Sequence, residues 1–105
     1  MGNQKLYKGS LQTIILKLLA QHNKMYGYEI TQKVKELTNG ELQITEGALY
    51  PALHKLEASG MLDVEVAKVG YRLRKYYKLT EIGTKETANK LAEMQEFLKT
   101  MQHLV

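Results

Sequence analysis

The segment from Thr45 to Gly60 carries side chains that are suited to close contact with a polar surface. Read as a helix, it places Leu49, Leu53 and Leu56 at the i, i+4, i+7 spacing of a single apolar stripe. The opposite side holds a glycine, a phenolic ring, a proline, an imidazole and an ammonium, from Gly47, Tyr50, Pro51, His54 and Lys55. Apart from the lysine, these are not the Glu, Lys and Gln of an ordinary solvated surface. We interpret this side as one that approaches a polar partner.

A basic stretch follows this segment. Residues 68–80 contain five basic side chains and no acidic one, whereas the complete chain of 105 residues has a net charge of only +4. A charge run is commonly just a solvated surface, but its position after the 45–60 segment favours a functional interpretation. A helix with a polar side, followed by a basic hairpin, is typical of a winged helix-turn-helix, which binds DNA.

In that interpretation the helix enters the major groove, where each base pair shows a distinct pattern of donors and acceptors. Its expected contacts are the N-cap Thr45, whose first-turn N–H groups would face phosphate, and Gly47, Tyr50, His54 and Lys55. The hairpin is expected to contact phosphates or the minor groove through Lys68, Arg72, Arg74 and Lys75. The alternatives are a partly buried surface aromatic for Tyr50 and a plain exposed histidine for His54.

The fold that must position these groups is predicted to be mainly α with a small β-hairpin. A first helix begins after Ser10, and Leu16 lies off its apolar stripe, which indicates a second buried contact. A second helix over 26–38, with Leu37 inward, ends at Asn39–Gly40, and residues 41–44 alternate like a short strand. The alternation of Leu62, Val64 and Val66 predicts the first strand of the hairpin, and Gly70 predicts its turn. The second strand is expected over 73–79, with either Tyr76 or Tyr77 buried.

The last helix, capped by Thr80, carries a heptad seam at Leu91, Met94, Leu98, Met101 and Val105, with Phe97 at its edge. The stripe either packs on its own domain or joins two copies of the chain, and we favour self-association that also uses the first helix. The sequence therefore predicts a winged-helix DNA-binding domain with an N-terminal arm over 1–80 and a dimerisation helix over 81–105.

Enzymatic and membrane functions find little support. The chain has no cysteine, which excludes disulfides and thiolate metal sites, and His22, His54 and His103 are scattered without metal-ligand spacing. We find no phosphate-cradling glycine loop and no nucleophile elbow. No apolar run is long enough to span a membrane, and no signal peptide is recognisable. We expect a cytoplasmic protein that is not an enzyme and uses no cofactor or metal.

Four motifs, at 26–30, 46–53, 56–60 and 74–80, together resemble the PadR family of bacterial transcriptional regulators. The resemblance covers roughly residues 9 to 83 and includes Leu-Tyr-Pro at 49–51 and Lys-Tyr-Tyr-Lys-Leu-Thr at 75–80. It implies a winged-helix domain, a homodimer formed largely through the C-terminal helix, and repression from a palindromic operator in double-stranded DNA. It also places Tyr50 on the DNA-recognition helix and residues 68–75 in the basic wing.

Two departures from the family pattern stand out. The wing is one residue longer than the usual Gly-Arg-Pro-Arg-Lys-Tyr-Tyr and lacks its proline, and a single helix follows it, as in the short subfamily. Some short members bind flat aromatic drugs between their subunits by stacking on tryptophan, but this chain has no tryptophan and only Phe97 in the last helix. Three hypotheses remain: a dimeric repressor, a repressor released by a small aromatic or hydrophobic effector, and a protein-interaction module whose basic wing only aids solubility.

Overall fold

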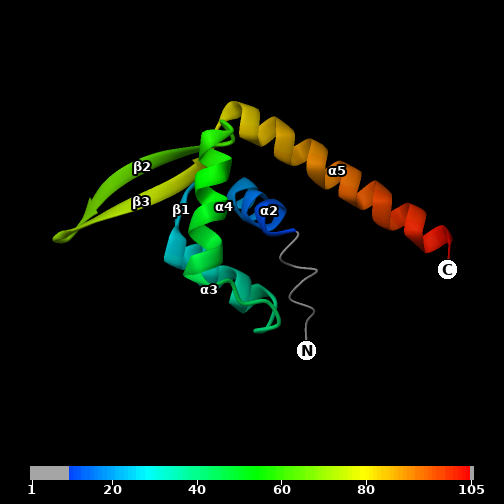
Figure 1. The fold of residues 1–105 in the computed structure, drawn as a ribbon, viewed down its shortest axis with the longest axis horizontal. Coiled ribbons are helices and arrows are strands. Elements are labelled where there is room, and N and C mark those ends of the chain that lie inside the picture. Colours follow the sequence, from blue (N-terminus) through cyan, green and yellow to red (C-terminus); the bar gives the residue numbers. More distant parts are fainter. Residues whose placement is uncertain (1–9, 105) are drawn as a thin grey trace.

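The computed structural model describes residues 10–104, in which helices pack at the base of a small antiparallel sheet (Figure 1). In chain order the elements are α2 (Leu11–Gln21), β1 (Met25–Tyr26), α3 (Gly27–Leu37), α4 (Glu46–Ala58), β2 (Leu62–Val69), β3 (Arg72–Leu79) and α5 (Glu81–His103). The hairpin of β2 and β3, called the wing below, projects from one end of the molecule, and α5 extends from the other. The predicted N-terminal arm (1–9) and Val105 lie outside the described residues.

The core lies where α2, α3, α4 and the base of the sheet meet. Ile15 and Leu16 of α2 are both buried, which confirms that this helix packs on more than one side. Ile30 of α3 and Tyr77 of β3 complete the same apolar cluster. Full burial of one isoleucine or leucine side chain stabilises the fold by roughly 2 kcal/mol. The cluster therefore fixes how the three helices are arranged.

α4 forms as its sequence predicts. The Thr45 side-chain oxygen accepts a hydrogen bond of 3.3 Å from the Ala48 N–H, which caps the helix. The predicted leucine stripe, Leu49, Leu53 and Leu56, is buried. Pro51 stands inside the helix, where it removes one N–H and crowds the carbonyl of residue 47. Residue 47 is an exposed glycine near the helix start, and α4 continues past the proline to Ala58.

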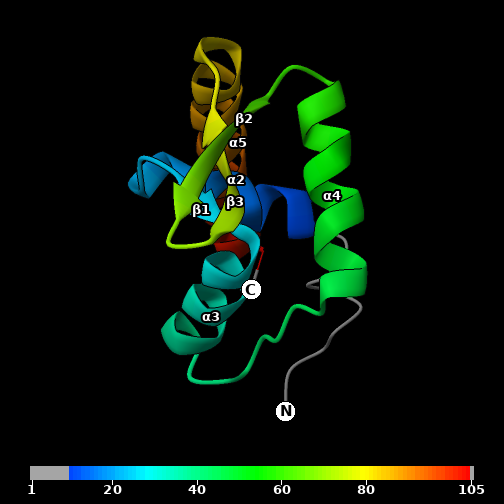
Figure 2. The same ribbon diagram turned by 90° about the vertical axis from the view of Figure 1, so that its left-hand side faces the viewer.

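The sheet has the strand order β1-β3-β2. β2 and β3 pair along their whole length, from Leu62 opposite Leu79 to Val69 opposite Arg72. Directly opposed residues share a face, so Val64 and Tyr77 lie on the core side, whereas Tyr76 lies on the outer side. Toward the tip the wing leaves the core (Figure 1), and Leu73 is 74% exposed. Figure 2 views the molecule from the side of the wing and shows α4 beside the sheet.

Three details of the predicted secondary structure were wrong. The third strand is not 41–44 but Met25–Tyr26, which pairs with Tyr77 and Tyr76. Residues 41–44 are a bend and irregular backbone rather than a strand, and the Leu42 N–H donates to the Thr38 hydroxyl. Leu37 is 61% exposed rather than inward. Ser10 precedes α2 without a side-chain capping bond.

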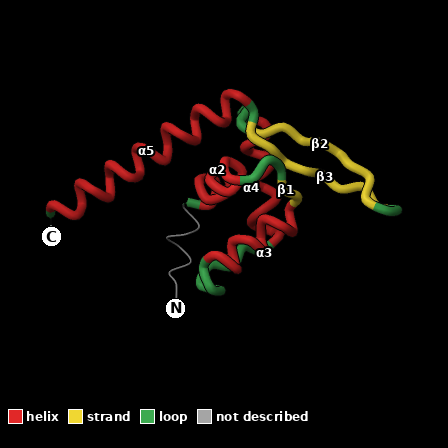
Figure 3. The backbone as a smooth tube through the Cα atoms, turned by 180° about the vertical axis from the view of Figure 1, so that it is seen from behind, coloured by secondary structure: helices red, strands yellow, loops and turns green. Residues whose placement is uncertain are grey.

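The start of α5 is tied to the end of α4. The Thr80 hydroxyl accepts from the Gly83 N–H at 2.9 Å and donates to the Gly60 carbonyl at 2.6 Å. Gly83 packs so tightly that a Cβ there would be 2.0 Å from the Met61 carbonyl oxygen. From Ala92 to Leu104 every residue is exposed. At 1.5 Å per residue α5 is about 35 Å long, and most of it extends away from the domain (Figure 3).

Candidate nucleic-acid interface

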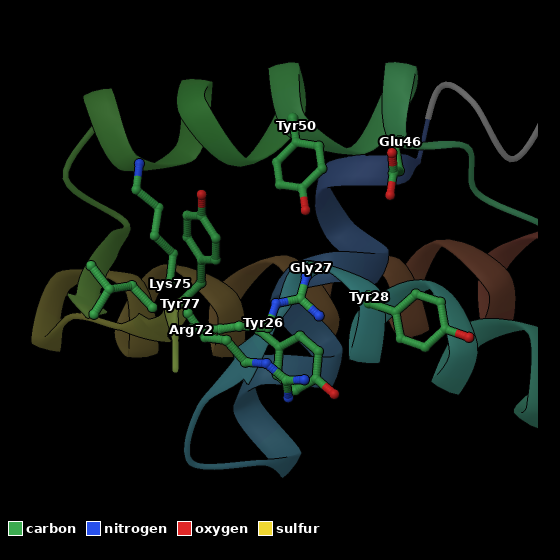
Figure 4. Close-up of a pocket in the computed structure, with 10 residues that line it drawn as sticks. Tyr26, Gly27, Tyr28, Glu46, Tyr50, Arg72, Lys75 and Tyr77 are labelled. Atoms are coloured by element: carbon green, nitrogen blue, oxygen red, sulfur yellow. The ribbon is translucent and has the colours of Figure 1, made fainter. Parts of the chain in front are cut away.

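α4 and the wing border an open groove of about 640 Å³ whose floor is the start of α3. Figure 4 shows Glu46 and Tyr50 pointing into it from α4, and Lys75 and Tyr77 pointing from the sheet toward α4. The complete lining is Tyr26, Gly27, Tyr28, Glu46, Tyr50, Arg72, Leu73, Arg74, Lys75 and Tyr77. The sequence-predicted polar helix and basic hairpin therefore meet at one surface.

The predicted contact residues of α4 form a continuous exposed surface. All five are exposed: Thr45, Gly47, Tyr50, His54 and Lys55. The rings of Tyr50 and His54 are neighbours, with centroids 6.5 Å apart. The helix thus buries its leucines and presents an aromatic, an imidazole and an ammonium to the outside, together with the free N–H groups of its first turn.

Tyr50 is not a freely rotating surface side chain. Its ring extends across to the first residue of α3, where a Cβ on Gly27 would be 2.5 Å from the tyrosine hydroxyl oxygen and 2.9 Å from Cζ. Gly27 therefore provides the space that the phenol ring occupies. The side chain is still 37% exposed, so it combines a fixed position with an accessible surface.

The four predicted basic residues of the wing divide between its two faces. Lys75 is two residues from Tyr77 on β3, and Lys68 is opposite Leu73, two residues further on. Both lysines therefore continue the core-side face, on the side toward α4. Arg72 and Arg74 lie on the outer face. Three of the four are exposed, and Arg74 is half-buried. The wing therefore offers cations on both faces rather than along a single row.

Sequence reasoning did not assign Tyr26, Tyr28 or Glu46 to the interface. The first two flank Gly27, and Tyr28 is 60% exposed. Their place in the groove follows from the pairing of β1 with β3, a contact between distant parts of the chain. The signal available in the sequence was the aromatic-glycine-aromatic order at 26–28, which belongs to the first of the four motifs. Glu46 brings one negative charge to an otherwise basic groove.

Two ionisable residues of the sheet, Glu65 and Tyr77, have shifted pKa values. Glu65, on the outer face of β2, forms ion pairs with Lys24 and with Lys78, the latter at 3.4 Å. The hydrogen bond from Lys24 is the main cause that lowers the pKa of Glu65, and the same bond raises the pKa of Lys24. Burial raises the pKa of the Tyr77 hydroxyl, with Glu57 adding to the effect. Tyr77 therefore stays neutral near pH 7.

A second, apolar groove of about 750 Å³ lies between α2, α3 and α5. It is lined by Leu91, Met94, Phe97 and Leu98 of the predicted seam, and by Leu37 of α3. Phe97 is 62% and Leu98 56% exposed, so their own domain does not cover them. Met101 and the unpredicted Leu104 extend the exposed apolar surface toward the C-terminal end of α5.

Other kinds of site are not found in residues 10–104. No group of three or more His, Asp or Glu side chains is placed to hold a metal ion there. Within the same residues, no helix has both the length and the apolar character needed to cross a membrane.

The helices, the three-stranded sheet and the projecting hairpin define a winged-helix domain. A model of the transcriptional regulator PadR-like family matches residues 15–89, and the chain therefore belongs to this family. A transcriptional regulator from Clostridium thermocellum is similar in structure over 100% of this chain and 99% of its own, with a TM-score of 0.86 and 30% identity.

Two further proteins are similar over shorter stretches. Bacillus subtilis PadR, whose structure is of a complex with operator DNA, is 30% identical, with a TM-score of 0.69 over 77% of this chain and 46% of its own. The transcriptional regulator Rv3488 of Mycobacterium tuberculosis is 39% identical over 64 residues, which are 61% of this chain and 57% of that protein. The family and these relatives are transcriptional regulators, not enzymes.

Proposed function

We propose that this chain is a homodimeric repressor that binds a palindromic operator in double-stranded DNA, in the cytoplasm. The observation that carries the proposal is the groove between α4 and the wing. There the exposed polar side of a helix and the basic side chains of a hairpin meet at one surface. A helix of this kind fits the major groove, and the wing cations fit the adjacent phosphates. The operator complex of Bacillus subtilis PadR supports the same use of the fold.

The dimer part of the proposal rests on α5. Exposed apolar side chains follow one another along a helix that projects from its domain. A seam of this kind is covered when two copies pair about a two-fold axis. Two copies of α4 would then face successive major grooves about 34 Å apart, which requires a pseudo-palindromic site. The family resemblance implies that binding to the operator represses transcription.

The test is binding to the DNA immediately upstream of the gene, measured by gel shift and by footprinting. We expect a protected inverted repeat, and an affinity that falls steeply with salt because phosphate contacts release counterions. Binding without salt dependence, or without preference for an inverted repeat over unrelated duplex, would contradict the proposal and favour the protein-interaction module.

A ligand-released version of this function has one observation in its favour, the apolar groove of about 750 Å³ between α2, α3 and α5. Its volume is within the range of small-molecule sites. A small aromatic or hydrophobic effector bound there would touch both the domain and α5, and would change how the two subunits are spaced. The fluorescent dye anilinonaphthalene sulfonate is a suitable probe. Dye binding that disappears in Phe97→Ala and that weakens operator binding supports this version.

A further inference from the structure

Four side chains form a continuous row of contacts, called the stack below, on the outer face of the three-stranded sheet. The Arg74 guanidinium carbon lies 4.3 Å from the centroid of the Tyr26 ring. The Tyr26 ring meets the Tyr76 ring edge to face, with centroids 5.5 Å apart and planes at 83°. The Lys24 ammonium lies 5.1 Å from the Tyr76 centroid. The order is cation, ring, ring, cation, in which each cation faces a π system.

The inner end of this stack is anchored. Lys24 pairs with Glu65, and Lys78 pairs with the other oxygen of the same carboxylate at 3.4 Å. Tyr76 lies on the central strand of the sheet and opposite Tyr26 of β1. The backbone of Tyr26 is also fixed, because its N–H donates to the Glu29 carboxylate at 3.1 Å. The ring that supports Arg74 is therefore positioned by its contact with the Tyr76 ring and by the fixed backbone of Tyr26.

The outer end of the stack is open. Among residues 10–104, Arg74 has no carboxylate within ion-pair distance. A guanidinium that stacks by its flat face keeps its N–H donors available at its edges. Arg74 and Tyr26 both line the groove between α4 and the wing. Arg74 lies beyond Tyr76, the last residue of β3 that pairs with β1, so the edge of β3 is uncovered there.

We propose that Tyr26 is a positioning residue for DNA binding: it holds the Arg74 guanidinium against its ring and directs the free donors to a phosphate of the duplex. The inference rests on the proposed DNA-binding function and adds a residue from outside α4 and the wing. A stacked arginine loses less side-chain entropy on binding than a free one, because it is already restricted before the phosphate arrives. The energetic contribution of Tyr26 is therefore made through Arg74.

The experiment compares the full chain with Tyr26→Leu, Tyr26→Phe, Arg74→Ala and the double variant Tyr26→Leu/Arg74→Ala. The probe is a fluorescein-labelled duplex of mixed sequence and about 30 base pairs, titrated at several salt concentrations from about 50 to 200 mM. Tyr26→Leu is expected to weaken binding by about two- to fivefold for each bound subunit, the size of an exposed cation–π contact. Tyr26→Phe keeps the ring and should bind like the wild type.

The double variant decides the mechanism. If Tyr26 acts through Arg74, Tyr26→Leu/Arg74→Ala binds no more weakly than Arg74→Ala alone. If the double variant instead loses affinity by the product of the two single fold-changes, the proposal is wrong. It is also wrong if Tyr26→Phe binds the duplex as weakly as Tyr26→Leu does. Should Tyr26→Leu fail to fold, Arg74→Lys gives a second test, because it keeps the charge but not the planar stack. An Arg74→Lys affinity equal to the wild type would then reject the proposal. A wild-type chain that binds no duplex would instead reject the proposed function itself.

Discussion

The hydroxyl oxygen of Tyr50 lies over Gly27, so close that a methyl group on residue 27 would be only 2.5 Å from it. This contact joins α4, which carries the predicted DNA-binding side chains, to the first residue of α3. It also explains why the Tyr50 side chain has a defined orientation although it lies on the exposed surface of α4. The ring fills a space that is present only because residue 27 has no side chain.

We therefore predict that Gly27→Ala weakens DNA binding while leaving the fold intact. The atoms that obstruct the new methyl belong to the end of a side chain, which can rotate away. Alanine in a helix is more favourable than glycine by up to about 1 kcal/mol, so the melting temperature should stay the same or rise slightly. The affinity for operator DNA should fall because Tyr50 no longer keeps its position. Thermal unfolding and fluorescence anisotropy measure the two effects separately.

Tyr50→Ala tests the same relationship from the other side. We expect specific affinity to fall by about 1–3 kcal/mol, the size of a good base or positioning contact, with a cooperative thermal transition retained. The double variant Gly27→Ala/Tyr50→Ala should bind like Tyr50→Ala alone, since the alanine at 27 has no ring left to displace. A Tyr50→Ala protein without a thermal transition would mean that the tyrosine is primarily a core residue.

On the wing, Arg72→Ala and Lys75→Ala probe its two faces. Each substitution is expected to lower the slope of log affinity against log salt by roughly one unit for every phosphate that each subunit no longer neutralises. The matched control is Lys99→Ala, which removes the same charge from the exposed distal part of α5. If only Lys75→Ala changes the slope, Arg72 does not contact phosphate; if neither substitution does, both side chains are excluded as phosphate contacts.

The parts of this structure that could be predicted are those with local causes. Thr45, the leucine spacing of α4 and the Asn39–Gly40 stop of α3 act within a few residues, and each lies where the sequence places it. β1 was missed because two residues cannot show an alternating pattern, and its partner strand is about 50 positions away. The contacts of Tyr50 with Gly27 and of Tyr26 with Arg74 depend on such distant pairings. Residue types indicated the region of the interface, but not which side chains support it.

The Glu65 ion pairs predict a dependence of stability on pH. Hydrogen bonding from Lys24 lowers the pKa of Glu65 in the folded protein, so the carboxylate form stabilises the fold. This contribution is complete above the ordinary pKa of a glutamate and is lost as the pH falls through the lowered value. We expect Glu65→Gln to reduce the melting temperature at about pH 7, and the difference from wild type to shrink below about pH 4. A constant difference across that range would show that Glu65 contributes by packing and not by charge.

The last prediction concerns the apolar surface of α5. Leu98 is 56% exposed in the single chain and lies at the centre of the predicted seam. Leu98→Glu places a carboxylate where the second subunit would bury it, and burial of an unpaired charge is strongly unfavourable. We expect a monomer by analytical ultracentrifugation and no specific operator binding, because one winged helix makes too small an interface to hold a half-site alone. The thermal transition should remain, since the residue has few neighbours in its own domain.

Ala92→Glu is the matched control, because it adds the same charge to an exposed position on the other side of α5. It should remain dimeric and bind operator DNA like the wild type. If both variants dissociate, added negative charge on α5 is sufficient and the seam is not specifically involved. If Leu98→Glu is still a dimer, the subunits join through another surface. The exposed Phe97 and Leu98 would then be free to bind an effector or a different protein, and operator spacing would have to be set by contacts outside α5.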